Sequence, residues 1–269
     1  MDDWEPPAPS RPRGRPSTAV VFLSILVLIG FGSAAYFYFR GSSPPVPSAA
    51  SAPLSDAPLA SPPPTPAAPE APSTPLPAVD GETLLRKLVS SWSSAPLVAK
   101  WLTAESLVQR LAASVQLVSA GQSPRSVLSF VELEGRFEVD EVGDTIAMSQ
   151  RSYIRYAPLV GALNSIDPMK AGLGYAQLRP YFDSIFRQVA EPGQRFDQVL
   201  VAALERLIQV KRPEGPVLLR PRGAIYLYAD ASLEALSPVE KQLLRLGPEQ
   251  MTSVQTWLRR FEAAAGLAR

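Results

Sequence analysis

The distribution of apolar residues divides the chain into three parts. Residues 19–39 (AVVFLSILVLIGFGSAAYFYF) carry no charge and few polar side chains. A helix of this length reaches about 31 Å at ~1.5 Å per residue, which matches the hydrocarbon core of a bilayer. Aromatic residues gather at its C-terminal end, as expected where a helix meets the lipid headgroups. The pattern therefore predicts one transmembrane helix over residues 18–39.

Basic residues beside this segment predict its orientation. Arg11, Arg13 and Arg15 precede it, whereas Arg40 alone follows it closely, and basic residues are enriched on the cytoplasmic side of membranes. The 21 arginines against 5 lysines, with many Ala and Pro, are typical of a GC-rich bacterial genome. We therefore expect a single-pass protein of the bacterial inner membrane with a cytoplasmic N-terminus and a periplasmic C-terminal domain. A cleaved signal peptide is the weaker alternative, because the apolar run is longer than a signal peptide needs.

Proline dominates the next segment. Thirteen of the 29 prolines fall within residues 41–79, together with many Ala and Ser and only two charges, Asp56 and Glu70. Such a composition cannot form a core and favours polyproline II, so residues 40–79 are predicted to be a disordered spacer that spans at most about 120 Å. A PxxP ligand at Pro63 to Pro66 is an alternative interpretation. Residues 1–17 hold five prolines and are predicted to be a disordered cytoplasmic tail.

Residues 80–269 show the periodicity of amphipathic helices and predict a mainly α fold: one all-helical globular domain with short irregular or hairpin segments. Ser237 and Glu240 have the spacing of a capping box, with Pro238 at the first helical position. Pro158 is expected to kink or split the helix that contains it. The other predicted helix starts are Thr103, Asp167 followed by Pro168, Pro180, Phe196, and Gly247 followed by Pro248.

Two stretches lack helical periodicity. Residues 122–145 contain one proline, two glycines and many acidic residues, and we predict an extended loop there. Within it, residues 137–140 alternate apolar and acidic side chains, which leaves a short strand or hairpin open. In residues 211–230 a short strand is predicted at Val217, Leu218 and Leu219.

The composition excludes several kinds of site. Without cysteine or histidine, the chain lacks Ser-His-Asp and Cys-His nucleophile systems and the usual zinc, haem and iron–sulfur ligands. A net charge of +1 argues against nucleic-acid binding, which normally requires a basic patch. The acidic residues from Glu132 to Asp144 could serve acid–base catalysis or bind a metal, but their spacing matches no calcium loop and solvated carboxylates are the better interpretation. We expect no catalytic residue, no metal site and no cofactor.

Aromatic and charged residues cluster at two positions, 153–156 (YIRY) and 226–230 (YLYAD). Such residue types are suited to a recognition surface. Tyrosines of this kind also bury their rings in ordinary cores, and Arg155, Arg220 and Arg245 could instead pair with Asp167 or Asp230. The predicted binding surface consists of Arg155, Tyr156, Tyr226, Asp230 and Arg245.

The same motifs resemble a known family. The segments that carry the resemblance are 155–160 (RYAPLV), 166–168 (IDP), 228–237 (YADASLEALS) and 244–249 (LRLGPE), with 107–110 (LVQR) near the start. They are similar to the proteobacterial domain-of-unknown-function family 3014. The resemblance covers most of residues 80–260 and implies a single N-terminal span and a low-complexity spacer. The family has no assigned reaction, so the resemblance implies no catalytic residues.

Two functions follow as hypotheses. The first is a membrane-anchored binding or scaffolding module, attached to the bilayer through residues 18–39, with an envelope protein or a cell-wall component as its partner. The second is an envelope hydrolase that uses carboxylates and would bring two of them within roughly 5–9.5 Å across a cleft. We expect the first.

Overall fold

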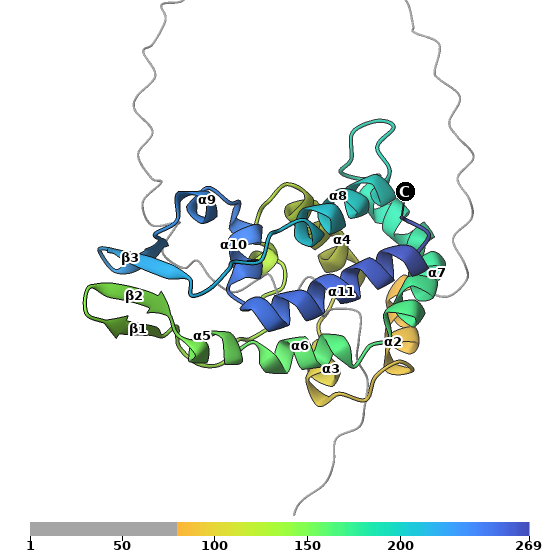
Figure 1. Cartoon of the computed structure of the whole chain (residues 1–269). Helices are drawn as coiled ribbons and strands as arrows, with labels where there is room; N and C mark the ends of the chain where they lie inside the picture. The colour runs from red at the N-terminus through yellow and green to blue at the C-terminus, as the bar shows by residue number, and fades with distance from the viewer. Residues whose placement is uncertain (1–79, 269) are drawn as a thin grey trace, which may run out of the picture.

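The computed structural model describes residues 80–268, which form a mainly helical structure with a small sheet at one end (Figure 1). Helix α11 (Pro248–Ala264) lies at the centre and contacts α6 (Ala157–Asn164), α7 (Pro168–Phe186) and α8 (Phe196–Ile208). Four further helices contact these: α2 (Gly81–Ser90), α3 (Pro96–Trp101), α4 (Leu107–Ser119) and α10 (Pro238–Leu244). The 3-10 turn η1 (Pro124–Ser126) contacts α4, α9 (Ala231–Glu234) contacts strand β4 (Ile225–Tyr228), and α5 (Gln150–Ile154) precedes α6 in the chain.

Aromatic side chains fill the centre between α7, α8 and α11. The rings of Phe182 and Phe196 are stacked with their centroids 5.0 Å apart, and Trp257 and Phe261 are stacked at 5.5 Å. Trp257 also donates its indole N–H to the carbonyl oxygen of Ile166 at 2.8 Å. Because a buried aromatic residue removes a large apolar area from water, these rings supply much of the stability of the core.

Four antiparallel strands form the sheet in the order β1-β2-β3-β4. The two outer pairs are hairpins whose two-residue turns begin at Gly143 and Gly223, and both glycines have the positive φ that such turns require. In the central pair, Ile146 lies opposite Leu219. The strands are β1 (Val139–Val142), β2 (Thr145–Met148), β3 (Leu218–Arg222) and β4 (Ile225–Tyr228).

One face of the sheet packs against the helices. Met148, Leu219 and Tyr228 are buried on this face. Because side chains alternate along a strand, Tyr226 shares the face of Tyr228, whereas Ile225 points to the opposite face. The sheet therefore continues the core at its inner end and presents side chains to solvent at its outer end.

The mainly α prediction is confirmed, but a sheet of four paired strands was not predicted. The hairpin left open near residues 137–140 is present, with its first strand two residues later at Val139–Val142, and the strand predicted at 217–219 is found at Leu218–Arg222. Strand β4 was not predicted. The pairing of β2 with β3 joins segments about 70 residues apart in the chain, which local periodicity cannot detect.

Two helix boundaries also differ from the prediction. Pro180 lies inside a continuous α7 and does not begin a new helix. Its missing N–H leaves the carbonyl of Ala176 without a helical partner, and Ala176 is exposed, so water can take that place. Helix α4 begins at Leu107 and not at Thr103, because Ser106 adopts a left-handed backbone conformation that a right-handed helix cannot include.

Several local predictions are confirmed. Asp167 caps α7 by accepting the N–H of Met169 at 2.8 Å. The helix around Pro158 is split as predicted, because α5 ends at Ile154 and α6 begins at Ala157, one residue before Pro158. Glu240 accepts the N–H of Ser237 at 2.8 Å, as its capping-box spacing predicts.

The predicted tail (1–17), transmembrane helix (18–39) and spacer (40–79) lie outside the residues that the structure describes. Over residues 80–268, no helix combines the length and apolar character that crossing a bilayer demands.

Candidate functional site

A row of three aromatic side chains and one arginine leads from strand β4 of the sheet into the core. The ring centroids of Tyr226 and Phe137 lie 6.1 Å apart. The guanidinium carbon of Arg155 lies 5.7 Å from the Phe137 ring and 5.1 Å from the ring of Tyr156. Tyr226 and Phe137 are 39% and 36% exposed, whereas Tyr156 is fully buried. We call these four residues the aromatic–arginine ladder.

The break between α5 and α6 positions the inner half of the ladder. Arg155 is the C-cap of α5 and Tyr156 the N-cap of α6. The Nε–H of Arg155 donates to the carbonyl oxygen of Ser152 at 3.1 Å, and its Nη2 lies 3.4 Å from the Tyr156 hydroxyl. The guanidinium is therefore fixed between two rings, in the geometry of a cation–π contact.

Arg245 approaches the same place from the end of α10. It hydrogen-bonds to the side chain of Tyr228, whose hydroxyl also donates to the carbonyl oxygen of Lys241 at 3.2 Å. Burial raises the pKa of Tyr228 to about 12, although the charge of Arg245 acts in the opposite direction.

Three arginine charges act on Tyr156. Burial raises the pKa of its hydroxyl, and the charges of Arg155, Arg245 and Arg125 act in the opposite direction. Arg125 belongs to η1, Arg155 follows α5 and Arg245 follows α10. We call these three residues the arginine cluster. It adjoins the ladder and shares Arg155 with it.

Asp230, the fifth predicted residue, has a different role. Its carboxylate caps α9 by accepting the N–H and the hydroxyl of Ser232, both at 2.7 Å. These hydrogen bonds lower its pKa. The predicted pairing of arginines with Asp230 or Asp167 is therefore not found, because both carboxylates cap helices instead.

The acidic run is distributed over surface contacts. Glu132 accepts a hydrogen bond from Lys100 at 2.6 Å, which lowers the pKa of the carboxyl group, and Glu138 pairs with Arg151 at 3.3 Å. Glu234 lies outside this run, in α9. Burial alone would raise its pKa, but its hydrogen bond with Lys241 and its other contacts lower the pKa overall. A general acid needs the opposite shift. Throughout the described part of the chain, no three acidic side chains gather as a metal site would require.

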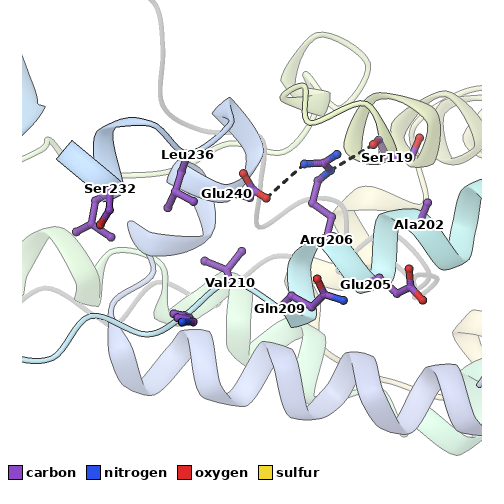
Figure 2. A pocket seen from close by; sticks show the side chains of 11 residues that line it. Ser119, Ala202, Glu205, Arg206, Gln209, Val210, Ser232, Leu236 and Glu240 are labelled. Carbon is purple, nitrogen blue, oxygen red and sulfur yellow. Dashed lines mark hydrogen bonds and ion pairs between the residues drawn. The ribbon is translucent and has the colours of Figure 1, made fainter. Parts of the chain in front are cut away.

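A separate groove of about 710 Å³ lies between α8, α9 and α10 (Figure 2). Arg206 spans its floor, where Nε donates to the carbonyl oxygen of Ser119 at 3.2 Å and Nη1 contacts Glu240 at 3.3 Å. Leu233 and Leu236 form an apolar wall. Since Arg206 uses these contacts to join the end of α4 to the start of α10, we interpret it as a structural residue.

Of the predicted surface residues, Arg155, Tyr156 and Tyr226 lie in the ladder and Arg245 lies in the arginine cluster, whereas Phe137 and Arg125 were not predicted. Phe137 carried a weak signal, since it was the apolar member of an alternating pattern. Arg125 carried none, because a single arginine after Ser123-Pro124 resembles any surface residue.

Comparison with known proteins places these residues in a family. Searches of curated proteins and of solved structures found no match. A family model described as "Protein of unknown function (DUF3014)" matches residues 107–262, which include the whole ladder and the arginine cluster. Because the match covers more than half of the chain, the protein belongs to the DUF3014 family.

Proposed function

We propose that this protein is a membrane-anchored binding module whose helical domain recognises an envelope partner through the exposed end of the aromatic–arginine ladder. The observation that carries the proposal is the exposed pair of Phe137 and Tyr226, held against Arg155. The apolar run at residues 18–39, with its arginine asymmetry, supports a single inner-membrane span and a periplasmic location for the domain.

The residue types and their rigidity both suit recognition. Tyrosine and arginine are enriched among the residues that dominate binding energy at protein interfaces. Arg155 is already ordered by two rings and by Ser152. Binding to a side chain that is already ordered costs less conformational entropy than ordering a mobile one.

The alternative, a hydrolase that uses carboxylates, has less support. A glycosidase of this kind needs one carboxyl group with a raised pKa opposite a second one. In the part of the chain that the structure describes, the three carboxyl groups with resolved shifts, Glu132, Asp230 and Glu234, are all shifted downward. These shifts favour the binding module.

Photocrosslinking tests the proposal with a control on the adjacent residue. A photoreactive amino acid is placed at position 226 or at position 225 of the full-length chain in membranes. Both native side chains are 39% exposed, yet they point to opposite faces of β4. We expect position 226 to crosslink a defined protein and position 225 not to. The purified partner should then lose about tenfold or more in affinity for Tyr226→Ser, with Ile225→Ser unchanged. Equal crosslinking at both positions would refute the proposed surface.

A further inference from the structure

We propose that the arginine cluster binds a carboxylate of an acidic peptide segment whose neighbouring apolar side chain packs on Phe137 and Tyr226. This inference rests on the proposed function and names the chemistry of the partner.

The first argument is the convergence of like charges. Arg125, Arg155 and Arg245 come from three separate segments, and their charges act together on the buried Tyr156 hydroxyl. Arg155 and Arg245 are only half exposed, so water screens their charges incompletely. An anion that reaches Arg155 is attracted by these charges, and guanidinium groups bind carboxylates through pairs of parallel hydrogen bonds.

The second argument is the number of N–H groups that Arg155 still offers. A guanidinium has five donors. Arg155 directs one to the carbonyl of Ser152 and one to the hydroxyl of Tyr156. Within residues 80–268 it forms no ion pair. Three donors on a fixed, half-buried guanidinium therefore stay available for a ligand.

A buried amide supplies a third argument. Gln242 is only 2% exposed, and no other described residue accepts a hydrogen bond from its Nε2. Its Oε1 lies 3.4 Å from the Ser123 hydroxyl, two residues before Arg125. Along α10, Gln242 precedes Arg245 by three residues, which places both on one helix face. This donor without an acceptor belongs to α10, the helix that Arg245 follows, and its amide group adjoins the segment that leads to Arg125.

The apolar neighbours favour a peptide over a free anion. Phe137 contacts Arg155 on one side and Tyr226 on the other, and both rings are partly exposed. A phosphate ion would use the arginines and leave these rings in water. A peptide with Asp or Glu next to an aromatic or aliphatic residue contacts both the arginines and the rings. Its apolar side chain buries area on the rings, and its carboxylate neutralises the cluster.

Calorimetric titration of two matched peptides tests this inference. The full-length chain, purified in a nonionic detergent, is titrated with acetyl-Phe-Glu-Phe-Glu-amide and with its neutral isostere acetyl-Phe-Gln-Phe-Gln-amide. We expect the acidic peptide to bind about tenfold tighter or more, a preference that decreases as salt is added. Arg155→Gln should remove the preference. Arg155→Lys should weaken it, because lysine keeps the charge but loses the planar pair of donors. Arg187→Gln, at the far end of α7, is the matched control and should change nothing.

The outcomes of the titrations and of the crosslinking experiment separate this inference from the proposed function. Equal affinity for the two peptides in the wild-type chain would overturn the inference, whether or not the Arg155 variants fold. Inorganic phosphate binding as tightly as the acidic peptide would also overturn it, because the site would then recognise an oxyanion without a peptide. Crosslinking at position 226 without a preference for the acidic peptide would refute only the anion chemistry. The reverse pattern would refute the proposed partner surface and leave the carboxylate site in place.

Discussion

Replacing Asp197 by Asn tests how a buried carboxylate holds the core together. Asp197 is 8% exposed and lies in the first turn of α8. Its Oδ1 accepts the hydroxyl of Tyr175 at 2.6 Å, and its Oδ2 contacts Arg195 at 3.1 Å and also Arg179. The substitution removes the negative charge of the side chain and keeps its size and shape.

The structure sets the expected magnitude. Asparagine still offers an oxygen to the hydroxyl of Tyr175, so the loss is the difference between a charged and a neutral acceptor, about 1–1.5 kcal/mol, plus about 0.3–1 kcal/mol for the carboxylate at a helix N-terminus. Arg179 and Arg195 are 41% and 65% exposed in their side chains, so water screens both pairs and each adds little. We therefore expect Asp197→Asn to lower the free energy of unfolding by roughly 1–3 kcal/mol. At about 2–4 °C per kcal/mol, the melting temperature should fall by roughly 2–12 °C.

A double-mutant cycle with Tyr175→Phe isolates the part of the hydrogen bond that depends on the charge of Asp197. Phenylalanine keeps the ring contacts of Tyr175 with Phe182, Phe196 and Phe261 and removes only the hydroxyl. Thermal unfolding of the wild type, both single variants and the double variant should give a coupling of about 1–2 kcal/mol. A coupling below about 0.5 kcal/mol would show that the hydroxyl and the carboxylate contribute independently, which would refute the reasoning.

Two further predictions concern glycine packing and pH. Gly174→Ala should destabilise the fold by about 2 kcal/mol or more, because the new Cβ would lie 2.2 Å from the ring of Trp92. Its control, Gly161→Ala in α6, meets nothing within 4 Å and should stabilise by about 0.5–1 kcal/mol, as denaturant unfolding of both variants would show. Stability should also fall as pH rises from about 10 to about 12, because the unfolded chain releases the Tyr228 proton first. Tyr228→Phe should flatten this part of the stability profile, and an unchanged profile would contradict the assignment.

Local signals predicted the helices better than they predicted the site. Caps such as Asp167 and Ser237 act within three residues, so the sequence contains all the information that they need. The sheet depends on the pairing of Ile146 with Leu219, and the arginine cluster on three segments that only tertiary packing brings together. Pro180 was misread because the exposure of the freed carbonyl depends on how α7 is oriented in the fold. Predictions failed where a contact between distant segments decides the structure.

The location of the ladder separates the proposed recognition surface from the residues that stabilise the core. The stacked aromatic core lies between α7, α8 and α11, whereas Tyr226 lies in β4 and Phe137 just before β1, and both rings are partly exposed. Removing an exposed ring at an interface affects binding, but it creates no cavity in the core. Arg155 is different, because it also bonds to Ser152 and stacks on the buried Tyr156. Substitution of Tyr226 is therefore the cleaner test of binding, and substitution of Arg155 has to be interpreted together with its effect on stability.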